Sequence, residues 1–215
     1  CVRLFTNHAV SLEGVEVRRY AEFEPSLAGL RHESVLISGD CSRFVHSHFE
    51  HAEFTDAVRN MQASKNDSEL AGMALAYFYD GVALTSLFGY MGANEGYTER
   101  DVADWLHEYK RAFPGYIGPS FPTIAATGTN SVIVHHSSTG AVVDKSKAFL
   151  LDCGSHYYFG TTDTSRTFLM AEGGACGEFM HDYTLVFKGQ VNAMSRNYGP
   201  DATTTAVDAA AREYL

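Results

Sequence analysis

Apolar residues repeat at helical spacing through the middle of the chain. Between Leu70 and Met91 they recur mostly every three or four positions, which predicts a helix of about six turns. Asn66 and Glu69 form a variant of the capping box at its start. The Asn66 side chain can accept the backbone N–H three residues on, and the Glu69 side chain can reach back.

A second helical pattern follows at residues 102–113. Thr98 and Asp101 have the spacing of another capping box directly before it. Proline and glycine then interrupt the chain between residues 114 and 122, which predicts a loop.

Between residues 121 and 170 the pattern changes to short β-rich segments. Residues 131–135 are rich in β-branched side chains, and residues 147–152 form a largely apolar run that ends in a carboxylate. Helical patterns return over residues 179–198 and 203–215. We therefore predict an α+β fold for this part of the chain.

The first 58 residues are short segments of mixed character. Residues 34–38 read as a buried strand, and residues 42–60 as a helix or a helix followed by a loop. The change from this mixed pattern to the long helix predicts a domain boundary between residues 55 and 65.

The composition is that of an ordinary globular protein. The 215 residues include 16 Lys and Arg against 26 Asp and Glu, which gives a formal net charge of −10. Such a chain has no electrostatic reason to bind nucleic acid or an anionic membrane surface. No segment approaches the roughly 18 consecutive apolar residues that a membrane-spanning helix needs.

The cysteines and the first residue indicate the compartment and the extent of the chain. The four cysteines are widely spaced without a Cys-x-x-Cys pair, which favours free thiols in a reducing cytosol. They are Cys1, Cys41, Cys153 and Cys176. The chain lacks an initiator Met, so we expect that it does not begin where its gene does.

Two carboxylates in the strand region are candidates for metal binding. Asp152 and Asp163 follow or interrupt β-rich runs, and a hairpin between them would bring them side by side. Carboxylate oxygens suit Mn²⁺, Mg²⁺, Ca²⁺ or Zn²⁺, and a cation would offset the repulsion between the two charges. Spacing alone favours the simpler interpretation that both are unrelated turn residues.

Histidines give two weaker candidates. His135 and His136 end the predicted strand on opposite faces, so at most one can point into a given site, where it could position a substrate or stabilise an oxyanion. His46, His48 and His51 form a competing metal candidate. For these three we favour a solvated face, because helical geometry leaves His46 off the face of the other two.

The sequence motifs of several enzyme classes are absent. The sequence contains no Gly-x-Ser-x-Gly, no Walker A loop, no Gly-x-Gly-x-x-Gly and no His-Glu-x-x-His. Nucleophile-elbow hydrolases, P-loop NTPases, dinucleotide enzymes and zincins are therefore not indicated.

Taken in order, six segments resemble the Xaa-Pro aminopeptidases of the pita-bread metallopeptidase family. That family carries Lys-Asn followed by Glu-Leu-x-Gly-Met, then Ser-Phe-Pro-Thr-Ile, Ile-Ile-His-Tyr, Asp-Ser-Gly, Gly-Thr-Thr-Asp-Ile-Thr-Arg-Thr and Tyr-Thr-x-Val-Leu-Lys-Gly. The matching segments here are Ala63–Met73, Pro119–Ile124, Asn130–His135, Leu150–Gly154, Gly160–Phe168 and Tyr183–Gly189.

The resemblance implies an arrangement of domains. Residues 1–58 would be the C-terminal part of a preceding creatinase-N-like α/β domain. Residues 59–215 would be the N-terminal part of the pita-bread catalytic domain, in which helices pack on a curved antiparallel sheet.

The resemblance also implies roles for individual residues. Asp152 would be a terminal ligand of one divalent metal ion, and Asp163 would bridge two, usually Mn²⁺, with Zn²⁺ or Co²⁺ as alternatives. His135 would contact the substrate carbonyl or the tetrahedral intermediate, and Phe121 would line the substrate pocket. The implied reaction removes the N-terminal residue from peptides with proline in second position, through a metal-bridging hydroxide.

The chain departs from the family at several positions. Cys153 replaces the family's usual Ser or Ala, and His136 replaces Tyr. Thr164-Ser165 replaces Ile-Thr or Val-Thr, and Gln190 replaces His. The Ser165 replacement keeps a hydroxyl that can hydrogen-bond a metal ligand. The family's remaining ligands, one His and two Glu, lie beyond Leu215, so we expect these 215 residues alone to be inactive and to bind metal weakly.

Two other functions stay open. A non-catalytic relative with this fold would bind proteins or peptides, and a prolidase-like enzyme would cleave dipeptides. The resemblance implies a homodimer, and the cysteine usage favours the cytoplasm.

Overall fold

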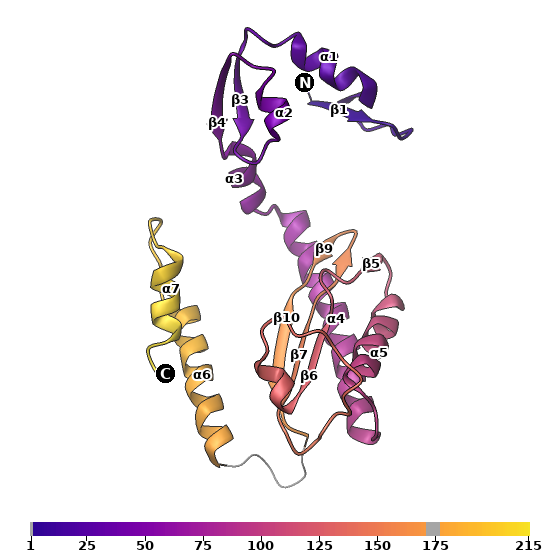
Figure 1. Cartoon of the computed structure of the whole chain (residues 1–215), viewed down its shortest axis with the longest axis vertical. Helices are drawn as coiled ribbons and strands as arrows, with labels where there is room; N and C mark the ends of the chain where they lie inside the picture. The colour runs from indigo at the N-terminus through magenta and orange to yellow at the C-terminus, as the bar shows by residue number, and fades with distance from the viewer. Residues whose placement is uncertain (1, 171–176) are drawn as a thin grey trace. The chain divides into compact units, whose positions relative to one another are not determined.

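A computed structural model describes residues 2–170 and 177–215 (Figure 1). The chain divides into two compact units, Cys1–Asp67 and Ser68–Leu215. The boundary predicted after residue 58 therefore falls inside the first unit, within a short helix. The assignment of the two parts to a creatinase-N-like and a catalytic domain stays a prediction.

The first unit contains two pairs of parallel strands with short helices between them. Its elements are β1 (Val2–Thr6), β2 (Val15–Arg19), η1 (Tyr20–Glu22), α1 (Phe23–Ala28), β3 (Ser34–Ser38), α2 (Arg43–His46), β4 (His51–Thr55) and α3 (Ala57–Ala63).

The sequence prediction for this unit is partly right. The strand at residues 34–38 is confirmed as β3, although only Ile37 is buried in it. The prediction of a helix, or a helix and loop, across residues 42–60 is wrong in its middle, where β4 pairs in parallel with β3. That pairing uses backbone groups 17 residues apart, as Ser34 and His51 show, so no local periodicity reports it.

The second unit combines four helices with two small antiparallel sheets of order β10-β7-β6 and β5-β8-β9. Its elements are α4 (Asp67–Ala93), α5 (Glu99–Arg111), β5 (Tyr116–Gly118), β6 (Ile124–Thr127), η2 (Gly128–Val132), β7 (Phe149–Cys153), β8 (His156–Tyr157), β9 (Gly160–Thr161), β10 (Thr164–Phe168), α6 (Gly177–Ser195) and α7 (Thr204–Ala211).

The helices lie where the apolar periodicity puts them. The capping box before α5 is confirmed, because Thr98 Oγ1 accepts the Asp101 N–H at 3.2 Å and Asp101 Oδ2 accepts the Thr98 N–H at 2.7 Å. The last two helices, α6 and α7, pack closely on each other. A Cβ on Gly189 would lie 2.0 Å from the carbonyl oxygen of Ala211, so this contact requires glycine.

The strand predicted at residues 131–135 is wrong. These residues form the end of η2 and a turn, and Val132 and Val134 are 81% and 83% exposed. β-Branched side chains favour a strand when neighbouring strands and a packed face surround them. Within the described residues this segment pairs with no strand, and Ser131 Oγ instead donates to the Gly128 carbonyl at 2.6 Å.

Helices α4 and α5 cover one face of the sheet β10-β7-β6 and form the core with it (Figure 1). Alternate residues of the central strand β7 point into this core, because successive side chains of a strand face opposite sides. Phe149, Leu151 and Cys153 are buried there, whereas Leu150 and Asp152 belong to the other face.

Helix α4 is long and apolar enough to cross a membrane by length and composition alone. One stripe of it, with Ala83, Leu87 and Met91, is buried against the sheet and α5. The same helix buries the carboxylate of Asp80. Since 33% of this apolar stretch is buried in the structure, packing in the core accounts for only part of its apolar character.

Helix α4 approaches the β8–β9 hairpin through a glycine. A Cβ on Gly72 would lie 2.1 Å from the carbonyl oxygen of Phe159, so Gly72→Ala must push the helix and hairpin apart. We expect this variant to lose about 1–3 kcal/mol of unfolding free energy in denaturant titration. Gly89→Ala on the same helix is the matched control, because nothing lies within 4 Å of the added Cβ, and it should gain about 0.4–1 kcal/mol. Equal effects of the two variants would contradict this packing.

Candidate active site

Asp152 lies near the end of β7, the central strand of its sheet. Its neighbours across the sheet are Ile124 of β6 and Ser165 of β10. Ser165 Oγ donates a hydrogen bond of 2.8 Å to Asp152 Oδ1, so the hydroxyl expected to survive at this position does orient the carboxylate.

Asp163 directly precedes β10, at the edge of the same sheet. Strand alternation gives it the same face as Ser165, two residues on, and therefore the same face as Asp152. Its neighbour Thr162 is buried on the opposite side, while Asp163 itself is exposed. Asp163 would be the diagonal neighbour of Asp152 if the register of β10 is continued back by one residue.

The predicted juxtaposition of the two carboxylates follows from this register. Two carboxylates on one face offer oxygen ligands to a divalent cation, which would also remove their mutual repulsion. In residues 2–170 and 177–215, no group of three or more His, Cys, Asp or Glu is arranged to hold a metal ion. The assignment of Asp152 and Asp163 as metal ligands therefore stays a prediction.

Phe121 lies close to this end of β7. A Cβ on Gly154 would lie 2.8 Å from Cε1 of the Phe121 ring and 2.0 Å from Ser120 Oγ. Glycine at 154 thus lets the Phe121 side chain pack directly against the turn that follows Asp152. The role of Phe121 in lining a substrate pocket stays a prediction.

A buried carboxylate on α4 supports the turn between the two aspartates. Asp80 is 1% exposed and accepts hydrogen bonds from α5 and from the β8–β9 region. Its donors are Lys110 Nζ at 3.1 Å, Ser155 Oγ at 2.8 Å, Tyr157 Oη at 2.9 Å and Thr162 Oγ1. Burial, together with the neighbouring Asp80 charge, raises the pKa of Tyr157, so this phenol stays protonated as a donor.

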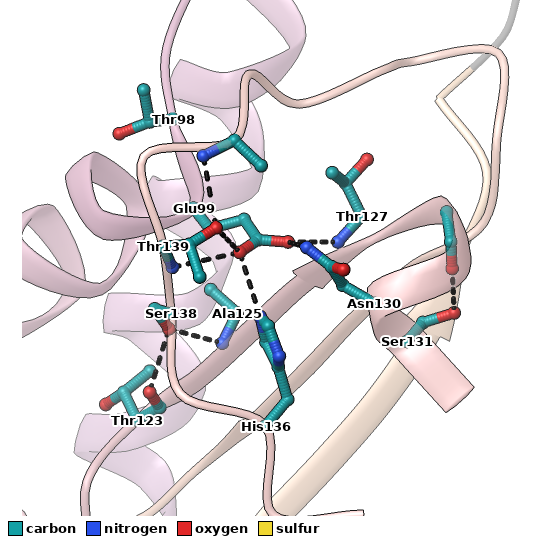
Figure 2. A network of polar contacts seen from close by, with 12 residues as sticks. Thr98, Glu99, Thr123, Ala125, Thr127, Asn130, Ser131, His136, Ser138 and Thr139 are labelled. Carbon is teal, nitrogen blue, oxygen red and sulfur yellow. Dashed lines mark hydrogen bonds and ion pairs between the residues drawn. The ribbon is translucent and has the colours of Figure 1, made fainter. Parts of the chain in front are cut away.

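A second buried carboxylate, Glu99, organises the segment that contains His135 (Figure 2). Glu99 is the first residue of α5 and is completely buried. It accepts the Thr127 N–H at 2.9 Å, Asn130 Nδ2 at 2.9 Å, the Thr139 N–H at 2.9 Å, Thr139 Oγ1 at 2.7 Å and His136 Nε2 at 2.9 Å.

These bonds decide the state of Glu99. Burial raises its pKa, but the hydrogen bonds from His136, Thr127, Asn130 and Thr139 outweigh that effect and lower the pKa to about 2. The carboxylate is therefore ionised at neutral pH. It joins β6, η2 and the residues around 139 to the start of α5.

The two adjacent histidines have different roles. His136 is buried, and its Nε2 is hydrogen-bonded to Glu99. His135 is exposed, and its φ of 54° lies in the left-handed region. His135 lies in a turn and not at a strand end, and none of the hydrogen bonds found among the described residues joins its side chain to Asp152 or Asp163. The catalytic and substrate-binding role of His135 stays a prediction.

The competing histidine cluster does not form a site. His46 ends α2 and stacks on Phe54, His48 bonds the carbonyl of Phe44, and His51 begins β4. These side chains belong to different elements, and they form no metal-binding group in the described part of the chain. The helical geometry assumed for the three residues does not hold, because they lie at a helix end, in a turn and in a strand.

Sequence reasoning did not identify Asp80 and Glu99. A signal for Asp80 existed, because it occupies the apolar stripe of its helix between Ala76 and Leu84, where a charge needs a buried partner. Glu99 gave no such signal, since an acidic residue in the first turn of a helix is common for electrostatic reasons alone.

Comparison with known sequences identifies the family. The pattern of metallopeptidase family M24 matches residues 70–215. A probable Xaa-Pro aminopeptidase P of Arthroderma otae is 35% identical over an alignment of 172 residues, and the match covers 76% of this chain and 27% of that protein. Its counterpart in Podospora anserina is 34% identical over an alignment of 175 residues, and the match covers 76% of this chain and 25% of that protein. The chain belongs to metallopeptidase family M24 and spans about a quarter of the length of these relatives.

Solved structures show the same fold. The X-prolyl aminopeptidase of Caenorhabditis elegans, described as a cytosolic enzyme with a di-nuclear active site, has a TM-score of 0.85 at 24% identity over 99% of this chain and 39% of that chain. The prolidase of Pyrococcus furiosus has a TM-score of 0.75 at 22% identity over 94% of this chain and 60% of that chain. The predicted α+β fold with part of a pita-bread domain is confirmed.

Because the pKa of Glu99 is low, we expect the stability of the fold to depend on pH. Its folded-state pKa of about 2 lies below the ordinary value of 4.5, so its contribution is fully present above pH 4.5 and is lost as the pH falls toward 2. We expect Glu99→Gln to cost about 3 kcal/mol of unfolding free energy at pH 7, and the difference from wild type to shrink between pH 4.5 and 2.

Denaturant titrations at several pH values measure this difference. Glu108→Gln is the matched control, because Glu108 lies on the same helix with its side chain 67% exposed and should change stability little. A Glu99→Gln deficit that stays constant down to pH 2 would refute the assigned ionisation.

Proposed function

We propose that this chain is part of the catalytic domain of a metal-dependent Xaa-Pro aminopeptidase. The reaction would remove the N-terminal residue from peptides that carry proline in second position. Family membership and the relatives named Xaa-Pro aminopeptidase P support the reaction class. The observation that supports the proposed site is the pairing of β7 with β10, which sets Asp152 opposite Ser165, two residues after Asp163.

In this proposal Asp152 and Asp163 would contribute carboxylate ligands to two divalent ions. Mn²⁺ is the proposed metal, with Zn²⁺ or Co²⁺ as alternatives. A bound metal pair supplies a water nucleophile at neutral pH and charge stabilisation for the oxyanion of the scissile carbonyl. The remaining ligands, one His and two Glu, would come from the longer protein, since the relatives are about four times as long as the matched region.

Other residues of the chain would serve the substrate. Ser165 fixes the orientation of Asp152 through its 2.8 Å hydrogen bond. Phe121, packed against Gly154, would form an apolar wall beside the aspartates. His135 would donate to the substrate carbonyl, and its exposed position leaves the imidazole accessible.

The proposed partners follow from the charge and the family. The substrate would be a peptide, and the net charge of −10 gives no support for nucleic acid or a membrane surface as a partner. A homodimer and a cytoplasmic location are part of the same proposal. The description of the Caenorhabditis elegans enzyme as cytosolic agrees with that location.

Dipeptide cleavage is the second candidate, because the Pyrococcus furiosus prolidase shares the fold at a TM-score of 0.75. Peptide length distinguishes the two enzymes. An aminopeptidase releases the first residue of Xaa-Pro peptides of three or more residues, whereas a prolidase-like enzyme accepts only the dipeptide. A non-catalytic binding protein would hold no metal and cleave neither.

Replacement of the aspartates tests the proposal in the full-length protein. We expect Asp152→Asn and Asp163→Asn to lower the bound metal, measured by elemental analysis, and to reduce release of the first residue from an Xaa-Pro tripeptide by at least about 100-fold. The reason is that an amide is a weaker and uncharged ligand. Asp104→Asn, an exposed carboxylate on α5, is the control and should match wild type. Full metal content and activity in both variants would exclude this site.

A further inference from the structure

Helix α4 contacts the candidate site through two side chains one turn apart. Tyr77 Oη donates to the Asp163 carbonyl at 3.3 Å and accepts the Asp163 N–H at 3.4 Å. Asp80, three residues further on, accepts a hydrogen bond from Thr162 Oγ1. The helix therefore holds both Asp163 and the residue directly before it.

The carboxylate of Asp80 is saturated by its donors. Oδ1 accepts from Ser155 and Tyr157, and Oδ2 accepts from Lys110 and Thr162. A carboxylate offers about four lone-pair sites, so each oxygen has its full complement. Because each donor occupies a defined lone-pair direction, the positions of Ser155 and Thr162 relative to α4 are fixed.

Thr162 is held at every polar atom. Its N–H donates to the Ser155 carbonyl at 2.9 Å, and its carbonyl accepts from Ser120 Oγ at 2.9 Å. Its hydroxyl accepts the Ser155 N–H at 2.9 Å while it donates to Asp80. Thr162 is 1% exposed, and one peptide bond separates it from Asp163.

Fold stability alone is a weak reason for this arrangement. The desolvation of a buried pair such as Asp80 and Lys110 offsets much of its attraction, so such pairs add little net stability and can serve to fix one geometry. The geometry fixed here is that of the backbone next to Asp163. Outer hydrogen bonds of this kind govern how well a ligand side chain meets its metal ion.

We propose that Thr162, held by Asp80, is a positioning residue that sets Asp163 for metal binding, with Tyr77 as a second support. The inference rests on the proposed function, because it assumes that Asp163 is a metal ligand. Loss of the Thr162 hydroxyl would free the Asp163 backbone and lower the metal affinity without removing any ligand.

Titration of Mn²⁺ into the metal-free, full-length protein tests this inference. Thr162→Val keeps the shape of the side chain but removes the hydroxyl, and it should raise the apparent Kd for Mn²⁺ by about 10–100-fold. Thr162→Ser restores the hydroxyl and should bind within about 3-fold of wild type. Thr129→Val, at an exposed threonine of η2, is the matched control and should bind as wild type does.

A second variant with its own control tests the inference even if Thr162→Val does not fold. Tyr77→Phe removes only a hydroxyl from a side chain that is 44% exposed, and it should also weaken Mn²⁺ binding. Tyr158→Phe, at a tyrosine that is 85% exposed, is its control. Thermal melts of the metal-free variants measure any loss of fold.

The kinetic constants give a further readout. At saturating Mn²⁺ we expect kcat of Thr162→Val and Tyr77→Phe to fall while KM stays within about 2-fold, since neither side chain touches the substrate.

Asp163→Asn separates the two proposals. If Asp163→Asn abolishes Mn²⁺ binding while folded Thr162→Val and Tyr77→Phe bind as wild type does, the positioning inference is overturned and the proposed function stands. If Asp163→Asn binds Mn²⁺ as tightly as wild type, both are overturned. Weak binding by Thr162→Val with rescue by Thr162→Ser supports the inference.

Discussion

The second unit depends on one constraint: a carboxylate buried in its core must be fully hydrogen-bonded. Isolated burial of a charge costs several kcal/mol, so the chain has to bring donors to it. Asp80 meets this need with Lys110 of α5 and with three hydroxyl groups of the β8–β9 region. The same four bonds join α4, α5 and the turn between the two candidate metal ligands. The hydrogen bonds of this one buried carboxylate therefore fix the position of the turn between the two candidate metal ligands.

Glu99, at the start of α5, is a second buried carboxylate that must be fully hydrogen-bonded. Its position at the start of α5 places it beside the end of β6, and its two oxygens collect donors from three successive segments (Figure 2). One of those donors is His136, which leaves the neighbouring His135 on the exposed side. His136, which stands where the family usually has Tyr, therefore has a structural role in this chain.

The sequence was most informative where structure is local. Helix α4 and the capping box of α5 follow from the spacing of side chains within one or two turns, so the predicted and observed elements agree. The errors at β4 and at residues 131–135 have the opposite cause. His51 is in a strand because Ser34 pairs with it, and Val132 is in η2 and not in a strand, since no partner strand is present in the described residues. Strand formation depends on partners that a local pattern does not contain.

By itself the sequence determined the family resemblance and the main helices, and it singled out the two aspartates as candidate ligands. Those features are carried by residue types at short, fixed spacings, and the pairing of β7 with β10 needs only a short connection. Only the tertiary structure decided which carboxylates are buried and what satisfies them. Asp80 and Thr162 are 82 residues apart, and Glu99 and His136 are 37 apart. Burial and hydrogen bonding between such distant residues arise when the chain closes its core, and no spacing along the sequence encodes them.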